Sequence, residues 1–179
     1  PTSGHLFTQK LEELKRLDRD VVIACPAASV TKLLRLEPRD EQRRLLDHMG
    51  ALTGARPGEL HGLQFKDVKV SEGVIYLDIY EQYALRRGRT PSKLSPLKTK
   101  HAKRLIPLHR ELEAPLKQWL SAGWQDFVGR APGDEDFIFV DADGNPYREH
   151  DSDQFQKELE LAGCDVTEKG ESLTRYSLR

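Results

Sequence analysis

The sequence lacks the features that mark membrane proteins, secreted proteins and zinc proteins. Its 179 residues contain no apolar run of 18, so no transmembrane helix is predicted. Two cysteines, Cys25 and Cys164, are too few for a disulfide framework or a four-cysteine zinc site. No apolar segment follows a basic N-terminus, so we expect no secretory signal. These absences favour one large domain, or one domain with an appendage, in a reducing, cytoplasmic setting.

Carboxylates are also missing from one long segment, although the formal net charge of the whole chain is only −1. Residues 82–110 carry nine basic side chains and no acidic one, whereas residues 111–171 carry 16 acidic and five basic ones. A solvated basic loop has this composition. A segment that faces phosphates has it too, because Lys and Arg neutralise phosphate charge. The motifs near the segment must therefore decide between the two.

The apolar spacing predicts an α+β fold that is mainly helical, with one small antiparallel sheet. Helices are expected over residues 6–19, 39–53, 109–128 and 150–162. A further short helix begins at Pro57, and residues 26–38 form a connector. Strands are expected over 73–80 and 103–108, and Pro107 restricts the second strand to an edge or an end. The two strands would form a hairpin or meander with basic residues at its turn.

Some single residues have a predicted environment. The helix over 39–53 presents one apolar face, formed by Leu45, Leu46, Met49 and Leu52, and Gly54 fits the position just after its end. The last predicted helix carries Phe155, Leu159 and Leu161 as apolar residues. Two tryptophans, Trp119 and Trp124, are expected in the core. Four histidines are expected at the surface, because no metal-site or acid–base spacing includes them: His48, His61, His101 and His109.

Three segments carry residues suited to phosphate chemistry. Arg56 lies on a Gly/Pro-framed turn before a helix start, where a guanidinium could grip a phosphate, or could simply pair with Glu59. Lys98 lies on the predicted basic hairpin, whose tip could equally be a solvated loop. Tyr176 and Arg179 are three residues apart, so they would share one face of a helix.

Taken together, these segments resemble the tyrosine recombinase (phage integrase) family over roughly residues 35–179. Residues 53–60, Thr-Gly-Ala-Arg-Pro-Gly-Glu-Leu, resemble the first arginine box of the family. Residues 98–108, which begin Lys-Thr-Lys, resemble its catalytic-lysine hairpin. Residues 173–179, Leu-Thr-Arg-Tyr-Ser-Leu-Arg, resemble the second box, usually His-x-x-Arg. Tyr176 replaces the usual histidine, a position where relatives tolerate tyrosine or lysine.

The resemblance implies a site-specific DNA recombinase that cleaves and rejoins strands through a 3′-phosphotyrosine intermediate. It implies that Arg56 and Arg179 hold the non-bridging phosphate oxygens and that Tyr176 orients the phosphate. Lys98 would protonate the leaving 5′ oxygen, with Lys100 as the alternative. Further basic residues would contact the DNA backbone: Arg86, Arg87, Lys100, Lys103 and Arg104. No metal and no cofactor is implied, because the arginines stabilise the charge of the transition state.

The resemblance also implies a domain organisation and partners. Residues 1–34 would be a linker or the tail of an N-terminal core-binding domain, and 35–179 the catalytic domain, with the nucleophilic tyrosine expected beyond Arg179. The chain as given would then be inactive. The implied partner is double-stranded DNA at recombination sites, bound by a tetramer of otherwise monomeric protein of bacterial or phage origin, without a membrane. The alternatives are a non-catalytic DNA-binding relative and a type IB topoisomerase. A basic face around Arg56, Lys98 and Arg179 would oppose an acidic face from 111–171.

Overall fold

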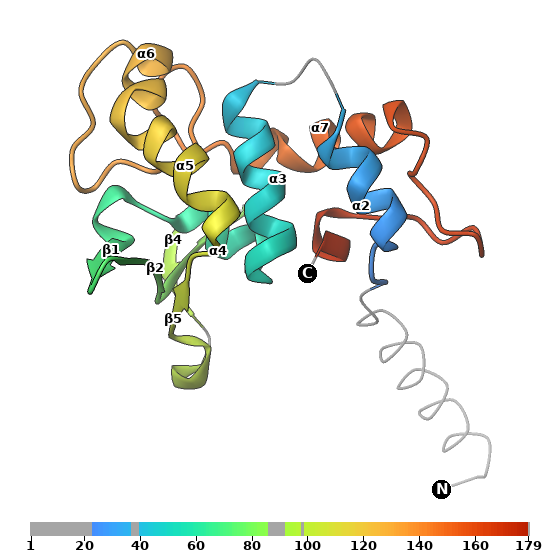
Figure 1. Cartoon of the computed structure of the whole chain (residues 1–179), viewed down its shortest axis with the longest axis horizontal. Coiled ribbons are helices and arrows are strands. Elements are labelled where there is room, and N and C mark those ends of the chain that lie inside the picture. Colours follow the sequence, from blue (N-terminus) through green and yellow to red (C-terminus); the bar gives the residue numbers. More distant parts are fainter. Residues whose placement is uncertain (1–22, 37–39, 86–91, 98, 179) are drawn as a thin grey trace, which may run out of the picture.

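The computed structural model describes residues 23–36, 40–85, 92–97 and 99–178, so the helix expected over 6–19 lies outside the described residues. One helix, α3, runs through the middle of the molecule, with α5 and the strands on one side and α2 and α7 on the other (Figure 1). The α-helices are α2 (Ala27–Leu34), α3 (Glu41–Thr53), α4 (Pro57–Gly62), α5 (Arg110–Gln118), α6 (Trp124–Val128) and α7 (Arg148–Leu161). None of the helices in the described ranges is long and apolar enough to cross a membrane.

Helix α3 ends where the sequence predicts and begins at Glu41, two residues later than expected. The carboxylate of Asp40 accepts a 2.6 Å hydrogen bond from the backbone N–H of Arg43 and so caps the first turn. Gly54 ends the helix in the left-handed conformation, with φ of 64°. Leu45 and its neighbours on the predicted face are buried, and Leu52 in the last turn is 38% exposed.

A three-stranded antiparallel sheet has the order β1 (Val68–Ser71), β2 (Val74–Ile79), β5 (Arg104–Pro107). Strands β2 and β5 are the two strands predicted from the sequence, and Pro107 lies on the edge strand as expected. A second ladder pairs β3 (Glu81–Ala84) with β4 (Lys93–Pro96) and lies in the chain between β2 and β5. Strands β1, β3 and β4 add to the two strands expected, so the sheet region is larger than the predicted hairpin or meander of two strands.

The helical run over 110–128 contains one π-helical segment, η3 (Trp119–Gly123), between α5 and α6. Both tryptophans are buried, as predicted. The indole N–H of Trp119 donates to the carbonyl of Ile138, and that of Trp124 to the carbonyl of Phe137, each across 2.9 Å. These bonds hold the segment of residues 137–140, in which Phe137 and Val140 form isolated β-bridges with Gln64 and Pro146.

Two clusters of buried apolar residues form the core. The larger joins α3, α4, β2, α5 and both tryptophans. The smaller joins α2, α7 and the C-terminal turn η4 (Arg175–Leu178), and it includes Leu33, Phe155 and Leu178. The connector predicted over 26–38 is therefore wrong, because Ala27–Leu34 forms a helix whose Leu33 is completely buried. The last helix is confirmed, although Leu161 at its end is 76% exposed.

Candidate functional site

Arg56 immediately precedes α4, and its side chain is 48% exposed. Its Nη1 atom lies 3.0 Å from Oε1 of Glu59, and its backbone N–H donates to Oε2 of the same carboxylate across 2.7 Å. The Glu59 side chain is completely buried. Both the backbone N–H and the guanidinium of Arg56 are thus bonded to Glu59, which fixes the turn that carries Arg56.

Arg104, the first residue of β5, contacts the same carboxylate. Its Nη2 lies 2.9 Å from Oε2 of Glu59 and its Nη1 lies 3.3 Å from Oε1. Burial alone would raise the pKa of Glu59, but the hydrogen bonds from Arg104 and Arg56 lower that pKa below its ordinary value. Two guanidinium groups therefore share one ionised carboxylate, which leaves one positive charge at a partly exposed position.

The other predicted site residues divide into those that the structure describes and those that it does not. Tyr176 lies in η4 and is 41% exposed. Lys103 is exposed directly before β5, and Lys100 begins the short helix η2 (Lys100–Ala102), where only its backbone is described. Four residues lie outside the described ranges: Arg86, Arg87, Lys98 and Arg179. The structure therefore brings Arg104 to Arg56 and leaves the placement of Lys98 and Arg179 as a prediction.

Side chains from the two arginine motifs lie against the same residue of α3, Gly50. A Cβ atom built on Gly50 would lie 3.4 Å from Cδ1 of Leu178 in η4 and 3.9 Å from Cδ1 of Leu60 in α4. Gly50 is one turn before the end of α3, from which the chain leads directly to Arg56. The turn that carries Tyr176 and the helix of the first motif therefore pack against the same part of α3.

Arg175, which the sequence analysis did not single out, is buried directly beside Tyr176. Its Nε lies 3.1 Å from Oδ2 of Asp151, its Nη2 lies 2.5 Å from Oδ1, and its Nη1 pairs with Asp47 of α3. Its guanidinium carbon lies 4.2 Å from the centre of the Phe155 ring. In the sequence Arg175 is only a basic residue inside the segment that resembles the second box, and nothing in that segment indicates its burial.

His61 belongs to the same buried cluster, so the prediction of a surface histidine is wrong for this residue. Its Nε2 lies 2.9 Å from Oδ2 of Asp151, and both side chains are completely buried. Arg43 of α3 also reaches Asp151, with Nη1 2.5 Å from Oδ1, and pairs with Glu158 across 2.8 Å. Burial would raise the pKa of Asp151, but the contacts with His61 and Arg43 lower it. The carboxylate is therefore ionised and accepts from three elements.

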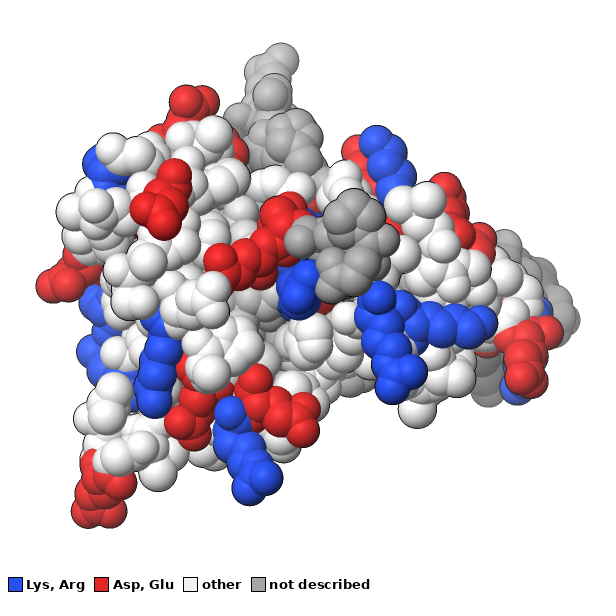
Figure 2. Space-filling view, turned by 45° about the horizontal axis from the view of Figure 1, so that its top comes forward, with Lys and Arg blue, Asp and Glu red and all other residues white. Residues whose placement is uncertain are grey.

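This cluster also changes the expected charge distribution. Asp151 and Glu158 contribute to the acidic segment 111–171, yet they are buried beside arginines. Other acidic residues of that segment pair at the surface, as Asp136 does with Arg130 at 2.6 Å. Figure 2 shows Lys and Arg side chains next to Asp and Glu side chains over one face. The acidic segment is therefore not simply a solvated acidic face.

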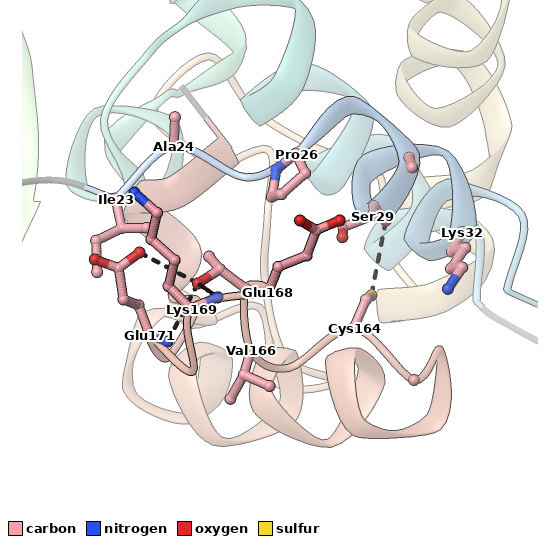
Figure 3. A pocket seen from close by; sticks show the side chains of 13 residues that line it. Ile23, Ala24, Pro26, Ser29, Lys32, Cys164, Val166, Glu168, Lys169 and Glu171 are labelled. Carbon is pink, nitrogen blue, oxygen red and sulfur yellow. Dashed lines mark hydrogen bonds between the residues drawn. The ribbon is translucent and has the colours of Figure 1, made fainter.

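A groove of about 620 Å³ lies between α2 and the segment of residues 163–171 (Figure 3). Its lining includes Lys32, Glu168, Lys169 and Glu171. The thiol of Cys164 lies 3.7 Å from the carbonyl of Ser29 across its wall. Among the residues that the structure describes, none of those assigned to the site from the sequence lines this groove.

Neither a protein-family model nor a curated protein matches the sequence. Solved structures do match the fold. XerA recombinase is 16% identical, with a TM-score of 0.58 over 89% of this chain and 47% of its own. The Tn1549 transposon integrase, in complex with transposon right-end DNA, is 21% identical, with a TM-score of 0.64 over 88% of this chain and 50% of its own. This chain therefore spans about half the length of those two proteins.

The match to the lambda integrase catalytic core extends over the greater part of that core. It is 18% identical, with a TM-score of 0.56 over 87% of this chain and 78% of the core. The helices around a small antiparallel sheet are thus arranged as in that core, and the predicted fold class is confirmed. The described part of the chain has the fold of tyrosine recombinase catalytic domains.

Proposed function

We propose that the chain forms the catalytic domain of a site-specific DNA recombinase and binds a DNA phosphate through Arg56. The observation that carries the proposal is the pair formed by Arg56 and Arg104 on the buried carboxylate of Glu59. A partly exposed guanidinium that pairs with a buried carboxylate keeps its remaining N–H donors for an incoming phosphate. The fold supports this position, because it is the fold of enzymes that act on DNA phosphodiesters.

The proposed reaction assigns one role to each residue of the two motifs and the hairpin. A tyrosine hydroxyl attacks the phosphorus atom and releases its proton to water, and the bond from phosphorus to the 5′ oxygen breaks as the phosphotyrosine bond forms. Lys98, or Lys100 in its place, gives its proton to the leaving 5′ oxygen. Arg56 and Arg179 stabilise the charge on the non-bridging oxygens, and Tyr176 donates a hydrogen bond to one of them. The arginines supply this charge stabilisation, so the proposal includes no metal and no cofactor.

The domain limits and the assembly belong to the same proposal. Residues 35–179 would act as the catalytic domain, and residues 1–34 would connect it to a further DNA-binding domain. Double-stranded DNA is supported as the partner by the Tn1549 integrase complex with transposon DNA. A tetrameric assembly on DNA is supported by the lambda integrase tetramer on a Holliday junction, which is 18% identical to this chain.

The phosphate contact is tested by measuring the affinity of the chain for duplex DNA at several salt concentrations. Arg56→Ala is expected to weaken binding about tenfold and to reduce the salt slope by about one. Lys117→Ala is the matched control, because Lys117 is 65% exposed on α5 and pairs only loosely, at 3.5 Å, with Glu113. If the two variants weaken binding equally, Arg56 has no special contact with phosphate.

The cleavage step needs a separate test with the gene product that contains this chain. A nicked suicide substrate traps the covalent protein–DNA adduct if the protein is a recombinase. Sequence-specific binding without an adduct would favour the non-catalytic DNA-binding relative. Relaxation of supercoiled DNA that contains no defined site would favour the topoisomerase.

A further inference from the structure

One carboxylate, that of Asp151 on α7, contacts the helix of the first arginine motif and the turn of the second. From the first motif, His61 of α4 lies 2.9 Å from Oδ2. From the second, Arg175 of η4 reaches both carboxylate oxygens, at 3.1 and 2.5 Å. Arg43 of α3 adds a third contact at 2.5 Å. Segments far apart in the sequence therefore meet at a single side chain.

Two of these contacts, those of His61 and Arg175, belong to elements that carry or adjoin a proposed phosphate-binding residue. His61 belongs to the short helix α4, whose start is fixed by the Arg56 turn. Arg175 directly precedes Tyr176 and lies on the same turn of 3-10 helix. A movement of either partner against Asp151 would therefore move the backbone that carries a site residue.

The surroundings leave the cluster little freedom. Asp151 and His61 are completely buried, and Arg175 is 5% exposed. The second motif is also held by backbone, since the N–H of Cys25 donates to the carbonyl of Ser177 across 2.7 Å. Buried ion pairs of this kind hold a fixed geometry because a displaced charge would lose its partners without gaining water.

We propose that Asp151 is a positioning residue, which sets the distance between the first and second arginine motifs so that both can contact one phosphate. The inference rests on the proposed function, because it assigns Asp151 a role in DNA binding through Arg56 and Tyr176. Asp151 itself is buried and touches no ligand. Its effect is transmitted through His61 on one side and Arg175 on the other.

The test is a double-mutant cycle on DNA affinity at low salt, which combines Asp151→Asn with Arg56→Ala. Asparagine keeps the volume of Asp151 but presents an NH₂ group to donors and removes the charge. With Asp151 in place, Arg56→Ala is expected to weaken binding about tenfold. In the Asp151→Asn background the same change is expected to cost less than about threefold, because Arg56 no longer shares its phosphate with the second motif.

Asp67→Asn supplies the matched background, since Asp67 is also a buried carboxylate and accepts from Tyr80 and the backbone of Gln64, away from Asp151. There the effect of Arg56→Ala should stay about tenfold. An equal Arg56→Ala effect in all backgrounds would show that Asp151 supports only the fold, and would overturn the inference. If Arg56→Ala has no effect even in the unaltered chain, the proposed function fails, and the inference fails with it.

Asp151→Asn could lose its fold, which circular dichroism would show. In that case the cycle is repeated with Arg175→Lys, which keeps a positive charge beside Asp47 but cannot make the two-point contact with Asp151. Reduced coupling to Arg56→Ala in this folded variant supports the inference. Unchanged coupling overturns it, because the second motif would then keep its position without the pair.

Discussion

Arg104 at the start of β5 donates to the buried carboxylate of Glu59 in α4 across 2.9 Å. This contact ties the strand that follows the lysine segment to the helix that follows Arg56. The carboxylate was expected only to fix the Arg56 turn. It also joins two parts of the site that are far apart in the chain.

Glu59→Gln should lower the stability of the protein, because it leaves two guanidinium groups without their shared countercharge. We expect a loss of about 1–3 kcal/mol in the free energy of unfolding, measured by urea titration. Glu135→Gln is the control, because Glu135 is 79% exposed in its pair with Lys66. An exposed pair contributes about 0–1 kcal/mol, so the control should change little. Equal losses would contradict the account of Glu59.

The stability should also depend on pH through Glu59. The pKa of its carboxyl is lower in the folded protein than its ordinary value of 4.5. Its contribution to stability is therefore complete above pH 4.5 and is lost as the pH falls further, through the folded pKa. Unfolding free energies measured against pH should fall more steeply below 4.5 for the unaltered chain than for Glu59→Gln. Parallel curves would show that the contacts with Arg56 and Arg104 do not shift this pKa.

Gly54→Ala should destabilise the connection between α3 and Arg56. Gly54 has φ of 64°, a conformation that a Cβ atom disfavours by about 1 kcal/mol. Gly133→Ala is the control, because its Cβ would meet only a side-chain oxygen of Asp136, at 3.7 Å, and its φ lies in the ordinary range. Thermal unfolding of both variants would test this, and a lower melting temperature for Gly133→Ala than for Gly54→Ala would contradict it.

Gly62→Ala should separate α4 from β3. A Cβ at this position would lie 2.9 Å from the backbone nitrogen of Tyr83 and 3.0 Å from the Cα of Gln82, and neither atom can move without the strand. We expect a stability loss of about 1–3 kcal/mol by urea titration. Gly58→Ala, whose Cβ would lie 3.3 Å from the carbonyl oxygen of Tyr83, should cost less. The reverse order would show that the strand yields easily.

Arg104→Ala should weaken the binding of duplex DNA by several-fold and reduce the salt slope by about one, if Arg104 faces the backbone as proposed. Lys69→Ala is the matched control, because Lys69 is an exposed basic residue on another strand, β1. Filter-binding or anisotropy titrations at several salt concentrations would separate the two. If the DNA affinities of Arg104→Ala and the unaltered chain depend equally on salt, Arg104 does not contact the DNA backbone.

Local signals in the sequence were sufficient for the elements around the first motif. Gly54 and Pro57 mark helix ends by their own backbone chemistry, so the end of α3 and the start of α4 could be predicted. Strands β3 and β4 could not, because their residues are all partly or fully exposed and show no alternation. Their strand conformation comes from pairing with each other and from packing on α4, which no short window of sequence contains.

The same limit applies to the candidate site. The pair of Arg56 and Glu59 lies within one turn of helix, so its spacing was visible in the sequence. The pair of Arg175 and Asp47 joins residues separated by 128 positions. Nothing in the local composition distinguishes Arg175 or His61 from exposed residues, because their burial depends on three helices that meet only after folding.

The register of β2 with β5 has a consequence for how the chain could vary. Ile79 and Arg104 are direct partners in the sheet, so the segment between them begins and ends at the same point of the β2–β5 ladder. A segment closed in this way can gain or lose residues at a small entropic cost, about 0.6 kcal/mol for each doubling of its length. Insertions between β3 and β4 would therefore alter how far the basic segment reaches while Arg56 and its helix stay where they are.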